Sequence, residues 1–255
     1  MKYVENARVV STEFLQKGIC NLVLECPKIA KDAKPGQFIE IYPDNGVNLL
    51  SRPISICGID VVVGNIRVVF QVVGKGTDIF SKLKKGDKVR VLGPCGNGYT
   101  LNDGTALLVG GGIGVPPLLE TAKRLDCKSK IAVLGFRSNP FLVNEFARVC
   151  DRVYVTTDDG SEGFKGNVVQ LMEKENLTAD MIYSCGPKIM LKFLSEYAMK
   201  NNIPCQVSME ERMACGIGAC LACVCKSTQV DDHSKVHNKR VCKEGPVFNA
   251  EEVEL

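Results

Sequence analysis

The chain has 255 residues, of which 45% are hydrophobic and 24% charged, so it can bury a core and lacks the composition of a disordered chain. Its net charge is +3, from 32 basic and 29 acidic residues that are interspersed, which argues against a nucleic-acid-binding protein. The longest apolar stretch, residues 106–119, is too short to span a bilayer, and the charged residues near the start lead us to expect no N-terminal signal segment. We therefore expect a cytoplasmic protein with neither a membrane nor a nucleic acid as its partner.

Short strands and turns dominate residues 1–101. Alternating apolar and polar residues predict five strands, and a short helix is expected at 78–83. Strands of this length and spacing are typical of an antiparallel β-barrel. The predicted strands are 7–11, 20–25, 37–42, 66–73 and 88–92.

Strands and helices alternate over residues 102–207, which predicts a parallel α/β sheet with crossover helices. Residues 208–255 form a small third module with little regular structure, which needs an internal cross-link to stay ordered. The fold class is therefore multi-domain β plus α/β. The predicted strands are 106–109, 131–136, 152–157, 181–184 and 205–208, and the predicted helices are 117–125, 141–149, 168–175 and 188–200.

Thirteen cysteines are many for a reducing compartment, and their odd number without a secretory signal argues against a disulfide framework. Those outside the C-terminal module that carry no motif are expected to be small, buried hydrophobic residues. They are Cys20, Cys26, Cys57, Cys127, Cys150 and Cys205.

The C-terminal module contains a C-x4-C-x2-C motif formed by Cys215, Cys220 and Cys223, followed at a distance by Cys242. This is the ligand spacing of a plant-type [2Fe–2S] cluster, which carries single electrons. The glycines between the first two cysteines let the backbone curve closely around an inorganic core. Cys225, in the same segment, is expected to point away from the metal.

A zinc site is the alternative for this segment, because its cysteine and histidine spacing is near that of a zinc finger. Zinc would leave Cys215 and Cys242 without a role, and no helix is predicted for the histidines. A Rieske centre would also need the two histidines, which lie in a polar stretch. The zinc ligands would be Cys220, Cys223, His233 and His237.

Two segments of the barrel are suited to a flavin. Arg52-Pro53-Ile54-Ser55, expected at the end of a strand, offers a guanidinium for phosphate and a hydroxyl for the flavin ring. Gly74-Lys75-Gly76-Thr77 directly precedes the short helix and could cradle a pyrophosphate. The plainer interpretation is that Thr77 is an ordinary N-cap, and the two roles are compatible.

A glycine-rich loop, Gly110-Gly111-Gly112-Ile113-Gly114, follows a buried strand and could let a dinucleotide approach the sheet. It departs from the strict G-x-G-x-x-G pattern, so a tight βα turn is the alternative. Asp158-Asp159 and Cys185-Gly186-Pro187 follow two later strands. Ligands of open α/β sheets bind beyond the carboxyl ends of strands, where all three loops fall, although Asp158-Asp159 is also suited to an Asx turn.

In this order, the motifs resemble the ferredoxin–NAD(P) reductase superfamily, and most closely the electron-transfer subunits of class 1B dihydroorotate dehydrogenases. The most specific stretch is 209–225, closed by 240–248. The resemblance implies an FAD-binding barrel over 1–101, an NAD-binding domain over 102–207 and a [2Fe–2S] module over 208–255. It places the cluster on Cys215, Cys220, Cys223 and Cys242, and FAD on Arg52, Pro53, Ile54, Ser55, Val69, Phe70, Gln71, Gly76 and Thr77.

The resemblance also implies a division of labour. A separate FMN-containing catalytic subunit oxidises dihydroorotate in pyrimidine (UMP) biosynthesis, and this chain, with no catalytic residue of its own for that step, passes the electrons through [2Fe–2S] and FAD to NAD+. A heterotetramer with two copies of each subunit is expected. One departure is Phe70-Gln71, where many members have Tyr-Arg.

Two other functions stay open on the sequence alone. A sister subunit of a sulfhydrogenase or of a ferredoxin:NADP oxidoreductase would share this fold and these cofactors and differ in its partner. A zinc-stabilised nucleotide-binding module without redox chemistry would differ in its absorption spectrum.

Overall fold

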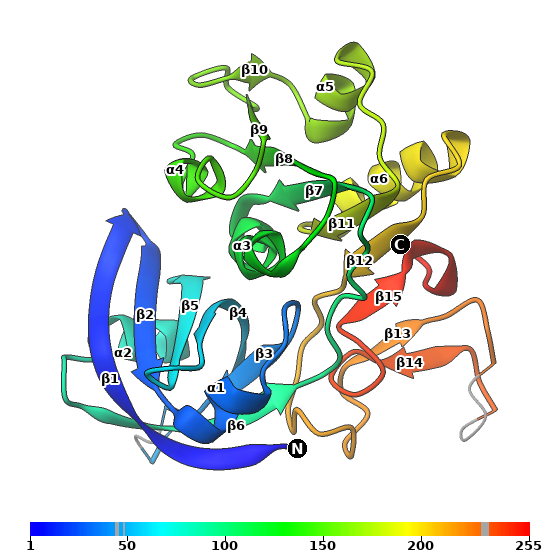
Figure 1. Cartoon of the computed structure of the whole chain (residues 1–255). Helices are drawn as coiled ribbons and strands as arrows, with labels where there is room; N and C mark the ends of the chain where they lie inside the picture. The colour runs from blue at the N-terminus through cyan, green and yellow to red at the C-terminus, as the bar shows by residue number, and fades with distance from the viewer. Residues whose placement is uncertain (44–45, 48, 231–234) are drawn as a thin grey trace.

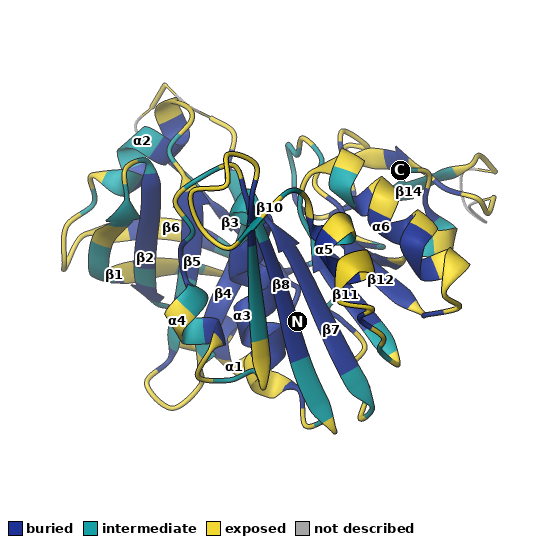
Figure 2. Cartoon of the chain, turned by 90° about the horizontal axis from the view of Figure 1, so that it is seen from above, coloured by how far each residue is buried: buried dark blue, intermediate teal, exposed yellow. Residues whose placement is uncertain are grey.

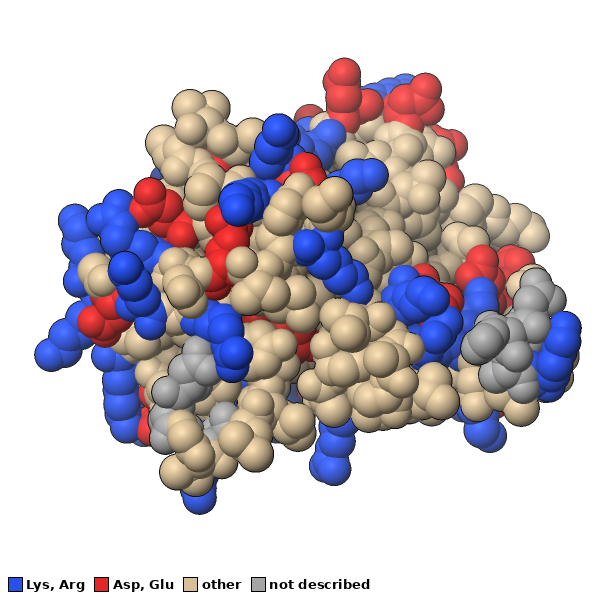
Figure 3. Space-filling view, turned by 90° about the horizontal axis from the view of Figure 1, so that it is seen from below, with Lys and Arg blue, Asp and Glu red and all other residues tan. Residues whose placement is uncertain are grey.

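The computed structural model describes residues 1–43, 46–47, 49–230 and 235–255. Its strands form a closed six-stranded barrel, a seven-stranded sheet and a two-stranded ribbon (Figure 1). This confirms the predicted fold class. Basic and acidic side chains are mixed over the face drawn in Figure 3. None of the helices in the described ranges is long and apolar enough to cross a membrane.

The barrel has the strand order β1-β2-β5-β4-β3-β6, with antiparallel neighbours throughout. Alternate residues of each strand, such as Ile39 and Ile41, point into an apolar core. The elements are β1 (Tyr3–Gln16), β2 (Ile19–Glu25), α1 (Pro27–Asp32), β3 (Phe38–Ile41), β4 (Arg52–Asp60), β5 (Asn65–Gln71), α2 (Lys75–Ser81) and β6 (Lys88–Cys95).

Two local predictions for the barrel are wrong. Arg52 to Ser55 begin strand β4 and do not end a strand, because Arg52 pairs with Ile41 where β3 ends. Helix α2 begins at Lys75, and its N-cap residue is Gly74. Thr77 therefore lies in the first turn of the helix and is not the N-cap.

The second sheet has the order β10-β9-β8-β7-β11-β12-β15, and its neighbours up to β12 are parallel. Its central strands are buried (Figure 2). The elements are β7 (Thr105–Gly111), η1 (Gly112–Gly114), α3 (Val115–Arg124), β8 (Ser129–Phe136), α4 (Val143–Phe146), β9 (Arg152–Thr157), β10 (Phe164–Lys165), α5 (Val168–Lys174), β11 (Met181–Cys185), α6 (Lys188–Lys200) and β12 (Cys205–Ser208).

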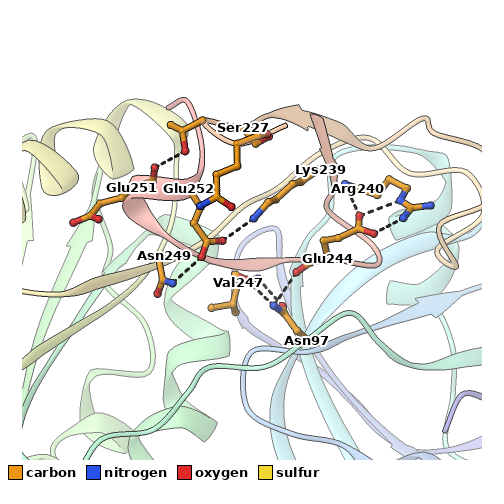
Figure 4. A network of polar contacts seen from close by, with 11 residues as sticks. Asn97, Ser227, Lys239, Arg240, Glu244, Val247, Asn249, Glu251 and Glu252 are labelled. Carbon is orange, nitrogen blue, oxygen red and sulfur yellow. Dashed lines mark hydrogen bonds and ion pairs between the residues drawn. The ribbon is translucent and has the colours of Figure 1, made fainter. Parts of the chain in front are cut away.

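The C-terminal segment is tied to both other parts of the molecule. Strand β15 pairs antiparallel with β12, so this segment supplies the edge strand of the α/β sheet. On the barrel side, the Asn97 amide donates to the carbonyls of Glu244 (2.9 Å) and Val247 (2.7 Å) (Figure 4). The domain boundaries given above remain predictions. The elements are β13 (Val224–Lys226), β14 (Asn238–Arg240), β15 (Val247–Asn249) and η2 (Ala250–Glu252).

The prediction that six cysteines are buried is only partly correct. Cys20, Cys26, Cys57 and Cys205 are buried. Cys127 and Cys150 are half-buried, because they lie just before β8 and β9, at the end of the sheet where the strands begin and solvent reaches the side chains.

Candidate functional site

The β13–β14 ribbon brings together cysteines that are distant in sequence. Val224 at the start of β13 pairs with Arg240 at the end of β14. Cys223 and Cys242 therefore lie at the same end of the ribbon, where the Cys242 amide is 3.4 Å from Cys223 Sγ. Both thiols are buried.

Cys215 and Cys220 form the second half of the cysteine site. The loop between them folds back so that the Ala219 amide donates to Cys215 Sγ at 3.4 Å. Burial raises the pKa of Cys215, but hydrogen bonds from the Ile217 backbone and from Cys220 outweigh it and lower the pKa to about 6. Burial and the nearby Cys223 thiol raise the pKa of Cys242 to about 12. One thiol of the site is thus already poised to be a thiolate, the form that binds metal.

The donor set fits a binuclear cluster better than a single ion. No group of three or more His, Cys, Asp or Glu side chains within the described ranges converges on one metal position. A [2Fe–2S] cluster does not need such convergence, since its two irons each take two thiolates. The four thiols fall into two neighbouring pairs, since Cys220 affects the pKa of Cys215 and Cys223 affects the pKa of Cys242.

Backbone conformation and side chains around the loop hold this arrangement. Gly216 and Gly218 have φ angles of 64° and 86°, in the left-handed region that favours glycine. The Arg240 guanidinium donates to the Gly218 carbonyl (3.1 Å) and is itself held by Glu244 (Figure 4). Lys2 Nζ donates to the Gly216 carbonyl at 3.3 Å.

The zinc alternative depends partly on His233, which lies outside the described residues. His237 is exposed, and its carbonyl accepts from the Ser227 amide at 3.0 Å. Cys225 is buried on β13, one of the two strands of the ribbon that carries the ligand candidates.

The two barrel segments predicted to bind FAD lie side by side. A Cβ placed on Gly76 would be 2.7 Å from Arg52 Nε, so a larger residue there would push the guanidinium away from the start of α2. Arg52 Nη1 donates to the Leu50 and Ser51 carbonyls, at 2.7 and 3.1 Å. This arrangement could present the guanidinium and the first turn of α2 to one pyrophosphate.

In the third segment predicted to bind FAD, residues 69–71, the side chains point in different directions. The Phe70 ring is buried and meets Phe80 edge-to-face, with ring centroids 6.3 Å apart, in the barrel core. Gln71 is exposed. Phe70 can therefore offer a flavin only its backbone. A Tyr at this position, as in many members, would likewise have its ring in the barrel core. Thr77 Oγ1 accepts from the Val73 and Gly74 amides, at 3.0 and 3.1 Å, and braces the loop before α2.

At the α/β sheet, the glycine loop and the Cys-Gly-Pro loop are in contact. They begin in the last residues of β7 and β11, which are adjacent strands. A Cβ on Gly114 would be 2.4 Å from the Cys185 carbonyl, and one on Gly111 would be 2.9 Å from Pro187 Cδ. Burial raises the pKa of the Cys185 thiol to about 12, so the thiol is neutral at pH 7. The two loops form one close-packed edge that a dinucleotide backbone could approach.

The aspartates lie further along the same edge. Their loop follows β9, which is separated from β7 by β8. Asp159 Oδ1 accepts from the Ser161 amide and hydroxyl, at 2.9 and 2.6 Å, so the predicted Asx turn is present. Asp158 is exposed.

A loop to which the sequence assigns no role lies between the glycine loop and the two aspartates. It follows β8 and begins with the exposed Arg137. The Asp159 amide donates to the Arg137 carbonyl at 3.4 Å, which places the backbone of this residue beside the acidic loop. The sequence could have indicated Arg137, since this residue immediately follows the predicted strand 131–136.

Proteins similar to this chain are known over nearly its whole length. Residues 210–254 match the family model described as the iron-sulfur cluster binding domain of dihydroorotate dehydrogenase B. Over 254 residues the chain is 42% identical to the "Dihydroorotate dehydrogenase B (NAD(+)), electron transfer subunit" of Caldanaerobacter subterraneus subsp. tengcongensis, covering 99% of both chains. It is also 42% identical to the subunit of the same name from Streptococcus thermophilus, covering 97% of both.

Solved structures share the fold. The structure of an NADH-dependent reduced ferredoxin-NADP oxidoreductase superimposes with a TM-score of 0.87 at 32% identity, over 98% of this chain and 90% of that one. A ferredoxin NADP+ reductase from Neisseria gonorrhoeae, solved with bound FAD and NADP, superimposes with a TM-score of 0.63 at 17% identity, over 78% of this chain and 91% of that chain. Taken with the full-length relatives, these findings show that the chain belongs to the family of dihydroorotate dehydrogenase B (NAD(+)) electron transfer subunits.

Proposed function

We propose that this chain passes electrons from the FMN of a dihydroorotate dehydrogenase catalytic subunit, through a [2Fe–2S] cluster and FAD, to NAD+ in pyrimidine biosynthesis. The observation that carries the proposal is that the cysteine loop packs on β3, the strand next to the predicted flavin segment of β4. Gly216 of that loop lies against Glu40 of β3, and Glu40 is the register partner of Pro53 in β4. The two redox sites would thus be neighbours within one chain.

The cluster would be held by Cys215, Cys220, Cys223 and Cys242, as two pairs of thiolates. Arg240 and Lys2 hold the loop carbonyls and keep the pairs in place. When bound, the cluster carries single electrons, and a flavin joins such a carrier to a nicotinamide, which exchanges electrons in pairs.

The FAD would be held by the three barrel segments. Arg52 would contact the phosphates beside Gly76 and Thr77, while Pro53, Ile54 and Ser55 line the start of β4. Ser55 is half-buried, so its hydroxyl could reach the flavin ring. Val69, Phe70 and Gln71 would contribute mainly through their backbone on the neighbouring strand β5.

NAD+ would bind at the carboxyl ends of β7 and β11. The residues that line this edge are Gly110, Gly111, Gly112, Ile113, Gly114, Cys185, Gly186 and Pro187, with Asp158 and Asp159 two strands away. We add Arg137 to this set, because its loop lies between the glycine loop and the aspartates.

The partner would be an FMN-containing catalytic subunit, in a heterotetramer with two copies of each chain. We place the complex in the cytoplasm, where a reducing environment keeps thiolate ligands available. The full-length similarity to named electron transfer subunits supports both the partner and the pathway.

The test is to co-express this chain with an FMN-dependent dihydroorotate dehydrogenase catalytic subunit and to purify the complex. We expect equal amounts of both chains, flavin and iron–sulfur absorption bands, and NADH formation that depends on dihydroorotate. A colourless chain that carries zinc, or one that never associates with the catalytic subunit, would contradict the proposal.

A second function is supported by one observation, the TM-score of 0.87 to the ferredoxin-NADP oxidoreductase structure. In that case the partner would be another flavin subunit, and reduced ferredoxin rather than dihydroorotate would supply electrons. The identity of 32% to that chain, against 42% to the dihydroorotate dehydrogenase subunits, favours the first function. Measuring NAD+ reduction with each electron donor separates the two.

A further inference from the structure

Glu40 on β3 is fully buried, and neither of its carboxyl oxygens has a hydrogen-bond partner within the described ranges. The buried Ser51 hydroxyl lies beside it and likewise makes no hydrogen bond of acceptable geometry there. Acidic side chains are almost never buried without a partner, because removing a carboxylate from water is costly. Such a group therefore calls for a functional explanation.

The strand places Glu40 outside the barrel core. Side chains alternate along β3, so Ile39 and Ile41 fill the barrel while Phe38 and Glu40 point outward. Phe38 packs in the apolar cluster that also contains Cys223 and Cys242. Glu40, two residues along on the same face, therefore points toward the cysteine module.

Glu40 also touches the cysteine loop itself. A Cβ on Gly216 would be 2.5 Å from Glu40 Oε1 and 2.6 Å from its Cγ, so the loop backbone rests on this side chain. Gly216 directly follows Cys215, and its carbonyl accepts a hydrogen bond from Lys2 Nζ at 3.3 Å. The carboxyl thus lies in the layer immediately behind the proposed thiolate ligands.

Few charges neutralise this group. Lys2, Arg52, Cys215 and the buried Cys95 are the charged or titratable side chains that interact with it, and neither Glu40 oxygen is hydrogen-bonded to Lys2 or Arg52. Burial raises the pKa of Glu40, and the nearby Ser51 hydroxyl and the two cations lower it only in part.

We propose that the carboxyl group of Glu40, packed against the cysteine loop at Gly216, lowers the reduction potential of the [2Fe–2S] cluster. The inference rests on the proposed function and deepens it. The potential of an iron–sulfur cluster depends on local charge, on hydrogen bonds to its sulfurs and on solvent exposure. When ionised, this fully buried carboxylate makes it less favourable to add an electron to the cluster, so an electron that arrives is passed on more readily toward FAD. Glu40 itself forms and breaks no bond.

The test is a redox titration of the full-length holoprotein, followed by the electron paramagnetic resonance signal of the reduced cluster. Glu40→Gln keeps the shape and removes the acid, and we expect the ratio of reduced to oxidised cluster at a fixed potential to rise about tenfold, which is about 59 mV for one electron. Glu40→Met, which needs no hydrogen bond, should shift the ratio in the same direction and serves if the Gln variant does not fold.

Glu120 offers a matched control. It is also buried, at 2% exposed, but its carboxylate is held by Arg124 Nε at 2.7 Å and by the Ile59 amide at 3.2 Å, on α3. Glu120→Gln should leave the cluster potential unchanged. An unchanged potential in both Glu40 variants, or an equal shift in Glu120→Gln, would overturn the inference. The absence of any cluster signal from the wild-type chain would instead overturn the proposed function.

Discussion

At the scale of single residues, Arg52 joins two segments that are separate in sequence. Its guanidinium lies over Gly76, where a larger residue would displace it. We predict that Arg52→Ala weakens FAD binding by about 10- to 100-fold, because hydrogen bonds to a charged phosphate contribute about 1.5–3 kcal/mol. Flavin retained after gel filtration measures the change.

Arg8 provides the matched control for this substitution. It is exposed on the barrel, where it pairs with Glu25 through a 2.6 Å hydrogen bond. Arg8→Ala should retain FAD as the wild type does. Equal flavin content in the Arg52 and Arg8 variants would move the phosphate site elsewhere.

Residue patterns predict the cysteine ligands but do not single out Glu40. The spacing of Cys215, Cys220 and Cys223 is local, so it is visible in the sequence. Glu40 reads as an ordinary polar residue of an alternating strand. Its contact at Gly216 joins the third strand of the barrel to the C-terminal loop, and such a tertiary contact leaves no periodic trace in the sequence.

At the scale of elements, most strands and helices were predictable from periodicity. The strand 152–157 and the helix 188–200 have the predicted bounds. Strand β4 was placed wrongly, because its start depends on pairing with β3. Strand β15 was missed, since a three-residue segment becomes a strand only when it adds to the edge of β12.

The barrel and the α/β domain are joined by an ion pair between β5 and α4. Arg67 donates two hydrogen bonds to Glu145, at 2.5 and 2.9 Å, and a third to Asn21 at 2.7 Å. The hydrogen bond from Arg67 is the main cause that lowers the pKa of Glu145. A lowered carboxyl pKa stabilises the fold above the unfolded-state value of about 4.5, and this contribution disappears as the pH falls through the folded-state value.

We predict that Arg67→Met lowers the free energy of unfolding by about 1–2 kcal/mol at pH 7, since Glu145 is left unpaired and only partly exposed. The loss should shrink as the pH is lowered below about 4.5. Urea denaturation at several pH values measures it. Arg8→Met, which breaks an exposed pair, should cost less than about 0.5 kcal/mol. A loss that is equal in the two variants, or that grows in acid, would contradict this prediction.

At the scale of the whole molecule, the cysteine loop lies at the surface, where a partner could reach it. Cys220 is exposed, and the side chains beside it, Ile217 and Leu221, are 49% and 57% exposed. Apolar side chains around an exposed redox site are suited to docking a partner protein. We therefore expect the catalytic subunit to cover this loop.

Leu221→Glu should weaken the complex with the catalytic subunit at least about tenfold, because it places a charge in an apolar contact. The absorption of the cluster should not change. Phe14→Glu is the control, since Phe14 is 55% exposed near the far end of β1 from Lys2, which contacts the cysteine loop. Equal affinities of the two variants, measured by titration of one subunit with the other, would place the docking surface elsewhere.

The central claim is that electrons reach NAD+ only through the four-cysteine site. The decisive measurement is dihydroorotate-dependent NADH formation by the reconstituted complex, comparing Cys220→Ser with Cys225→Ser. We predict that the first variant loses the cluster and NADH formation while it keeps FAD, and that the second retains all three. NADH formation at the wild-type rate by the Cys220→Ser complex would contradict the account.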